Sequence, residues 1–490
     1  MASLSQKVTR GVRWTSINTI STTAINFIEL AVLAHLLGAE AYGLIAIISV
    51  ITGLASVFSD LGLSSAVIQR KSPTHKELST LYWINVLSGF AIFTLFALIA
   101  PLVATVFGSP QLATLLSVAA LSFVIAPFGA QFSALIQKEL RFDVVTKFNI
   151  ASSLVGIAVS VALALHDPNA WALICGSLSV TFSLTIMRIA WAKHANMLPS
   201  LYFNWEDQKG YLSFGIYRAA ALFINHVNSR IDQLLIGSLL GPVALGYYHI
   251  AFRLVIAPIM KINSVLTTVA FPAFSTVQDN TALLKKGFMK MIGFVTSANA
   301  PVLVGMAAVA PLLVPIFLGE QWHPAIPLVQ ILAFYSLLRS FGNAAGSLII
   351  AKGKAKWTFY WNLSLTLLIP PTIFAAAKMG SIIDICYSLV LLHLFHFLLH
   401  YRVFIRNLIG PCFSEYFVVI AKPFILALCM GALMSLVTRF VPINSDILSF
   451  ALAATVGICA YVILSFVFQK ALVIEVIGLL FARPRRESLS

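Results

Sequence analysis

The chain has 490 residues, of which 59% are hydrophobic and 10% are charged. Because a soluble protein averages about 45–50% apolar and about 25% charged residues, this composition excludes an ordinary cytosolic enzyme, a disordered chain and a disulfide scaffold. It indicates an integral membrane protein with many spans. The formal net charge of +15 would suit a nucleic-acid partner, but membrane proteins also carry excess Lys and Arg in their cytoplasmic loops. We therefore expect no nucleic acid among its partners.

Fourteen apolar segments follow one another along the chain. A spanning helix needs about 20 mainly apolar residues, and turn residues such as Gly241-Pro242 separate the segments. The segments are 12–37, 42–66, 78–106, 112–137, 144–165, 170–191, 211–238, 243–272, 288–317, 325–350, 358–377, 381–401, 417–437 and 447–468. The sequence therefore predicts an all-α, multi-pass membrane protein with 14 transmembrane helices.

The distribution of Lys and Arg predicts the orientation of these helices. An even number of spans places both termini on one side of the membrane. If that side is the cytoplasm, only Lys378 and Arg439, among the 32 basic residues, fall in outer loops. Because cytoplasmic loops carry the excess of basic residues, we expect both termini to be cytoplasmic. The basic tail, 469–490, is expected to form an interfacial helix on the inner leaflet.

The first and seventh segments resemble each other. Residues 36–43 align with residues 239–246 at an offset of 203, and under the same offset Glu29 falls on Asp232. Six segments separate the two copies, so both enter the membrane in the same direction, which predicts a parallel repeat with a pseudo-two-fold axis along the membrane normal. The expected parts are an N-terminal lobe of helices 1–6 (1–200), a C-terminal lobe of helices 7–12 (201–410), and helices 13–14 with the cytoplasmic tail (411–490).

Several basic residues lie at bilayer depth. Segment 8 carries Arg253, Ala257 and Lys261 in an i, i+4, i+8 row, and segment 10 carries Arg339. Each cation facing lipid would cost about 2.5–3.5 kcal/mol, so we expect these side chains to face water, a counter-charge or a ligand. One interpretation is structural ion pairing, for example of Arg253 with Asp232; the other is a cationic, water-filled chamber that holds an anion. The candidate substrate-binding residues are Arg253, Lys261, Arg339 and Arg218.

Three acidic residues within or beside the apolar segments are candidates for ion or proton coupling. They are Glu29, Asp60 and Asp232. The alternative is that they balance the buried cations or bond to neighbouring helices.

Other chemistry is not expected. The histidines 393, 396 and 400 share one side of segment 12, but no Asp, Glu or Cys joins that face, so interhelical hydrogen bonding is favoured over a metal site. Nucleotide-binding and hydrolase motifs do not occur. We expect no metal, no cofactor and no enzymatic activity.

Two stretches resemble a known family. Residues 58–70 read FSDLGLSSAVIQR and residues 77–86 read ELSTLYWINV. These are similar to the polysaccharide transporter family of the MOP flippase superfamily, particularly Wzx-type colanic-acid and teichuronic-acid exporters. The resemblance implies two six-helix lobes around a central cavity, plus two extra helices. It also implies flipping of an undecaprenyl-pyrophosphate-linked oligosaccharide across the bacterial inner membrane by alternating access, for exopolysaccharide or lipopolysaccharide synthesis. Implied partners are the lipid-linked substrate, membrane lipids and a glycan polymerase or export complex.

Three other functions compete with this one. A MATE-like drug/cation antiporter would favour an acidic or apolar cavity rather than a surplus of cations. A membrane-bound glycan polymerase or ligase usually needs a large outer loop, whereas the outer connections here are short. A scaffold without transport would not need polar stripes on several helices. The antiporter is the main alternative.

Overall fold

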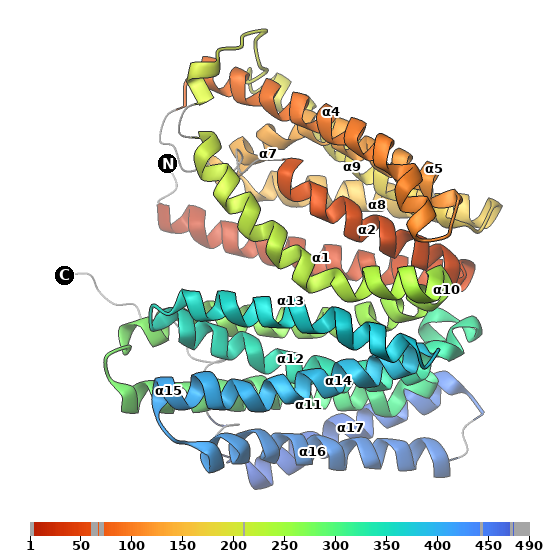
Figure 1. The fold of residues 1–490 in the computed structure, drawn as a ribbon, viewed down its shortest axis with the longest axis vertical. Helices are drawn as coiled ribbons and strands as arrows, with labels where there is room; N and C mark the ends of the chain where they lie inside the picture. Colours follow the sequence, from red (N-terminus) through yellow and green to blue (C-terminus); the bar gives the residue numbers. More distant parts are fainter. Residues whose placement is uncertain are drawn as a thin grey trace. The chain divides into compact units, whose positions relative to one another are not determined.

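The computed structural model describes residues 4–59, 67, 73–208, 211–441, 444–470 and 474. Within these residues the secondary structure consists of helices joined by short turns (Figure 1). The all-α prediction is therefore confirmed. The chain divides into two compact units, Met1–His249 and Ile250–Ser490.

The first unit contains the helices up to the middle of α10. They are α1 (Leu4–Leu36), α2 (Ala39–Ser59), α4 (His75–Val106), α5 (Gln111–Ala119), α6 (Leu121–Ile125), α7 (Pro127–Lys138), α8 (Phe142–His166), α9 (Ala170–His194), η1 (Trp205–Gln208) and the first part of α10 (Tyr211–Thr276). The predicted segment 112–137 is bent by 46° between Ile125 and Pro127. A proline at the first position of a helix lacks the N–H that would continue the preceding helix, so α7 starts anew there.

Helix α10 covers two predicted segments, 211–238 and 243–272. Its backbone leaves the helical region at Gly241, where φ is 80° and ψ is 175°, a conformation that glycine adopts without strain. Tyr248 donates a hydrogen bond to Asp232, so the chain folds back at Gly241 into two arms. We call residues 211–240 the first arm and residues 242–276 the second arm.

The second unit contains the second arm from residue 250 onward and the remaining helices. These are α11 (Thr281–Leu318), η2 (Glu320–Ala325), α12 (Ile326–Ala351), α13 (Ala355–Ala377), α14 (Ile382–His400), the π-helical η3 (Tyr401–Ile405), α15 (Arg406–Ile409), α16 (Phe413–Phe440) and α17 (Asp446–Phe468). Helix α11 packs against α12, α16 and α17. The two last helices are therefore joined to the rest of this unit through α11.

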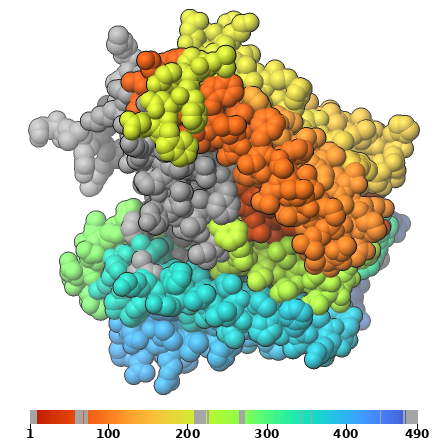
Figure 2. All heavy atoms as spheres, turned by 45° about the horizontal axis from the view of Figure 1, so that its top comes forward, coloured from red at the N-terminus to blue at the C-terminus, as the bar shows by residue number. Residues whose placement is uncertain are grey.

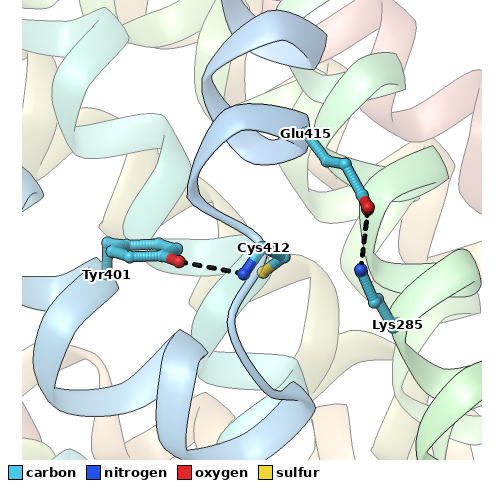
Figure 3. Close-up of polar contacts among 4 residues, drawn as sticks. All are labelled: Lys285, Tyr401, Cys412 and Glu415. Atoms are coloured by element: carbon cyan, nitrogen blue, oxygen red, sulfur yellow. Dashed lines mark hydrogen bonds and ion pairs between the residues drawn. The ribbon is translucent and has the colours of Figure 1, made fainter.

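Polar contacts fix the start of α16 (Figure 3). Lys285 of α11 forms an ion pair with Glu415, with 2.8 Å between Nζ and Oε2. The backbone N–H of Cys412 donates to the hydroxyl oxygen of Tyr401 over 3.0 Å. Burial raises the pKa of the Cys412 thiol, which keeps the thiol protonated and unreactive.

The surfaces of several helices are apolar. Helix α4 lies in the orange part of the surface in Figure 2. Its residues Leu87, Leu98 and Leu102 are 60%, 74% and 65% exposed. Large exposed apolar surfaces of this kind are covered by lipid in membrane proteins. In the described part of the chain, twelve helices are long and apolar enough to cross a membrane, or up to 13 if the bent pair formed by 111–125 and 127–138 is one span. The protein is thus a multi-pass membrane protein, and the count of 14 is not confirmed, because α10 joins two predicted segments.

Candidate functional site

The second arm of α10 presents a cationic face within the second unit. Arg253, Ala257 and Lys261 are exposed, as their spacing of four residues on one helix face requires. The opposite side of the same helix is buried through Val255 and Ile259, which are 0% and 2% exposed. The arrangement is that of an amphipathic helix whose polar stripe is basic.

Helix α12 places a third cation beside this arm. Phe252, next to Arg253, lies 6.3 Å from the ring of Tyr335 between ring centroids, and Tyr335 precedes Arg339 by one helical turn. Arg339 is half-buried. The ring contact between Phe252 and Tyr335 thus joins the second arm to α12. Arg253 follows one of these two residues, and Arg339 lies one helical turn after the other.

Two glycines follow Arg339 along α12, Gly342 and Gly346, and both have open space beside them. A Cβ added to Gly342 or to Gly346 would meet no atom within 4 Å. Gly342 is exposed and Gly346 is partly so. Each of these two glycines therefore has open space where a side chain would begin.

Among the described residues, no acid forms an ion pair with the cations Arg253 and Lys261 of the second arm. The side chain of Asp232, the expected partner of Arg253 in the ion-pairing interpretation, instead accepts a 2.6 Å hydrogen bond from the hydroxyl of Tyr248. The backbone N–H of Gln233 donates to the other carboxylate oxygen over 2.9 Å. Each carboxylate oxygen of Asp232 therefore accepts a hydrogen bond, and neither donor is a basic side chain.

A second polar pair lies beside the first. His249 Nδ1 donates to Gln233 Oε1 over 3.2 Å, since the amide oxygen can only accept. Both pairs, Asp232 with Tyr248 and Gln233 with His249, join residues 16 apart across the fold at Gly241. All four side chains are at least nine-tenths buried. The sequence pattern identifies Asp232 as a candidate but not Gln233, Tyr248 or His249. These residues can be paired from the sequence only if the chain is assumed to fold back at Gly241-Pro242.

The polar stripe of α1 is used partly for helix packing. Asn149 of α8 donates to Asn18 over 3.2 Å, and Thr22 bonds back to the carbonyl of Asn18 over 2.7 Å. Asn26 is exposed and Glu29 half-buried. The coupling candidate Glu29 therefore lies on a face whose first polar residue already binds a neighbouring helix. Its role in ion coupling stays a prediction.

Two of the sequence candidates lie outside the described residues. Asp60 follows the described end of α2, and the side chain of Arg218 is not described. Of the remaining candidates, Arg253, Lys261 and Arg339 lie in the second unit, and Glu29 and Asp232 lie in the first.

Two of the three histidines of α14, His393 and His396, differ from the expectation of interhelical hydrogen bonding. His393 and His396 donate through Nδ1 to carbonyl oxygens of their own helix, over 3.0 and 3.1 Å. Their rings pack edge-on against aromatic rings of other helices instead, with His393 4.5 Å from Tyr335 and His396 5.0 Å from Trp361. A helix interior allows a histidine to bond the carbonyl four residues earlier, so interhelical bonds are not required to satisfy it.

Comparison with known proteins places the chain in a family. Residues 32–327 match the family described as polysaccharide biosynthesis protein. The chain belongs to this family. It is 33% identical to the lipopolysaccharide biosynthesis protein WzxC of Escherichia coli (strain K12), over 87% of this chain and 86% of the relative. It is 30% identical to the teichuronic acid biosynthesis protein TuaB of Bacillus subtilis (strain 168), over 95% of this chain and 96% of that protein. The resemblance to Wzx-type polysaccharide transporters is thereby confirmed.

A solved structure shows the same fold. The lipid II flippase MurJ in an inward closed conformation superposes with a TM-score of 0.73 at 15% identity, covering 94% of this chain and all of that chain. At this identity the likeness concerns the fold. The chain thus shares the helical fold of that flippase.

Proposed function

We propose that the protein exports a lipid-linked oligosaccharide across the bacterial inner membrane by alternating access, with both termini in the cytoplasm. The cargo is an oligosaccharide on a polyprenyl diphosphate such as undecaprenyl pyrophosphate. The observation that carries this proposal is the basic stripe Arg253–Ala257–Lys261, which is exposed, belongs to a helix long and apolar enough to cross a membrane, and forms no ion pair among the described residues.

The cost of leaving this stripe in lipid supports an anionic cargo. Arg253 and Lys261 together would cost roughly 5–7 kcal/mol if lipid surrounded them, a large part of a total stability of about 5–15 kcal/mol. A hydrated pathway removes that cost, and a diphosphate group attracts both cations. The glycan then remains in water while the polyprenyl tail stays in the bilayer.

The relatives support the same class of cargo. WzxC and TuaB are named for the synthesis of lipopolysaccharide and teichuronic acid, and the MurJ flippase is named for lipid II. The MATE-like antiporter is less well supported, because a basic face repels a cationic drug. Arg218 is proposed as a further contact to the cargo, and a glycan polymerase or export complex as a partner.

Three acids are proposed to couple export to an ion gradient. Glu29, Asp60 and Asp232 are the carboxylates within or beside the spans of the first unit. Replacement by Gln or Asn should change the dependence of export on proton or sodium gradients. Identical gradient dependence in all three variants would remove the coupling role.

The cargo proposal is tested by neutralising the cations. Arg253→Gln, Arg339→Gln and the double variant are expressed in cells that lack the native gene, with Arg439→Gln as a control for basic charge near a predicted outer loop. Since a hydrogen bond to a charged group contributes about 1.5–3 kcal/mol, each single variant should lower export by roughly 10–100-fold. Lipid-linked sugar should then accumulate on the inner leaflet. Normal export by the double variant, at normal protein levels, would show that the cations do not hold the cargo.

A further inference from the structure

Two glycines bring the backbones of α2 and the second arm of α10 into contact. A Cβ built on Gly43 would lie 1.8 Å from the carbonyl oxygen of Pro242. A Cβ built on Gly246 would lie 1.8 Å from the carbonyl oxygen of Ala39. Both glycines are helical and neither has a positive φ. Backbone freedom therefore does not explain them, whereas the close approach of two helices does.

The two contacts are reciprocal. Under the offset of 203 residues found in the sequence, Gly43 corresponds to Gly246 and Ala39 corresponds to Pro242. Each glycine thus lies against the residue equivalent to the one that its counterpart contacts, as residues do on either side of a two-fold axis. The two contacts therefore give the start of α2 and the start of the second arm a local two-fold relation.

The chemistry of the contact allows it to open and close. Each glycine meets the main chain of the opposite helix, so interlocked side chains do not have to change rotamer when the helices part. In a transporter built from two repeats, the halves rock about a central site, and the contact on the axis must break at one end of the pathway for cargo to leave. Under the proposed orientation, the starts of α2 and of the second arm lie at the outer end.

We propose that Gly43 and Gly246 form the closing contact at the outer end of the transport pathway, and that export requires this contact to separate and re-form. The proposal rests on the transport function proposed above. It assigns a role to two residues that do not touch the cargo. A larger residue at either position holds the two helices apart and favours the outward-open state.

The first experiment locks the contact without changing either glycine. Glu40 and Val243 are exposed, correspond to each other under the offset, and each follow a contact residue. Both are replaced by Cys in a variant lacking the five native cysteines, and a short, cleavable bifunctional thiol reagent joins them in intact cells. Export should fall at least tenfold on crosslinking and return after the spacer is cleaved. Full export by the crosslinked protein would overturn the proposal.

The second experiment wedges the contact open. Gly43→Ala and Gly246→Ala are compared with Gly38→Ala, a matched control in the adjoining turn where an added Cβ meets nothing within 4 Å. A Cys placed at Ala257 reports access from outside to a membrane-impermeant thiol reagent. Both variants should increase labelling several-fold and lower export, while the control stays at the wild-type level. Labelling and export equal to the control in both variants would also overturn the proposal.

The outcomes separate this proposal from the proposed cargo. If the cationic face does not hold the cargo, Arg253→Gln exports normally while the crosslink still stops export. If the glycine contact has no closing role, Arg253→Gln blocks export while the crosslinked protein continues to export.

Discussion

The bond between Tyr248 and Asp232 should stabilise the fold at Gly241 measurably. The Tyr248 side chain is fully buried and Asp232 is 5% exposed, so water cannot replace the bond when it is removed. Tyr248→Phe deletes the hydroxyl and keeps the ring, so the packing of the two arms is retained. The variant therefore isolates one hydrogen bond of 2.6 Å.

The expected loss follows from the charge of the acceptor. A hydrogen bond to a charged group contributes about 1.5–3 kcal/mol. Asp232 keeps the N–H of Gln233 at 2.9 Å, so the carboxylate is not left without any donor. We therefore expect Tyr248→Phe to lower the free energy of unfolding by about 1.5–3 kcal/mol.

A double-mutant cycle provides the measurement. Unfolding of Tyr248→Phe, Asp232→Asn and the double variant is followed in detergent micelles, with Tyr360→Phe as a control because Tyr360 is 64% exposed. Contacting residues show interaction energies of roughly 0.5–3 kcal/mol. If the two single losses add without an interaction energy, or if the control loses as much as Tyr248→Phe, the two arms are not held by this bond.

Three further substitutions test the packing of the helices. Gly89→Ala should cost about 1–3 kcal/mol of stability, because its Cβ would lie 2.2 Å from the carbonyl oxygen of Phe123; thermal unfolding in detergent measures this loss, and an unchanged Tm would contradict it. Asn299→Ala should lower the free energy of unfolding by roughly 1 kcal/mol, since it removes the 2.9 Å hydrogen bond that Asn299 donates to buried Asn263. A loss of less than a few tenths of a kcal/mol would show that this bond does not hold α11 to α10. Glu415→Gln should cost less than about 1 kcal/mol, because the ion pair of Figure 3 is partly exposed, and the loss measured in denaturant should shrink as salt rises.

Hydrophobic length predicted where helices lie, because the bilayer imposes one length on every span. The segment 78–106 falls on α4 and ends at the same residue. Its start was placed three residues late, because Thr74 and Glu77 form a capping box that extends the helix into polar sequence. Hydropathy therefore does not predict helix ends that consist of polar residues.

The number of spans could not be derived in the same way. The break at Pro127 and the fold at Gly241 both interrupt apolar sequence, yet the first bends a helix by 46° and the second reverses the chain. A proline or glycine shows where the backbone can deviate from a helix. How far it turns depends on what the following residues pack against.

The candidate site was predictable to the extent that one helix determines it. Arg253, Ala257 and Lys261 share a face because of helical periodicity, and the structure shows that face exposed. The partner of Asp232 was not predictable, because Tyr248 reaches it only after the chain has reversed at Gly241. Charge alone favours an ion pair for Asp232, whereas in the structure the neutral phenol of Tyr248 donates a hydrogen bond to its carboxylate.

The repeat shows how a sequence signal can be correct without revealing its meaning. The alignment of 36–43 with 239–246 identified Gly43 and Gly246 as equivalent. Equivalence in sequence says nothing about distance, since two halves of a transporter can carry the same turn at opposite edges. The structure places these equivalent turns so close that a Cβ built on either glycine would lie 1.8 Å from a carbonyl oxygen of the other turn. Because a contact on a two-fold axis is made by the same residues of both halves, a substitution at either glycine alters one shared interface. Export should therefore respond alike to Gly43→Ala and Gly246→Ala, and a defect confined to one of them would mean that the contact does not act as a symmetric unit.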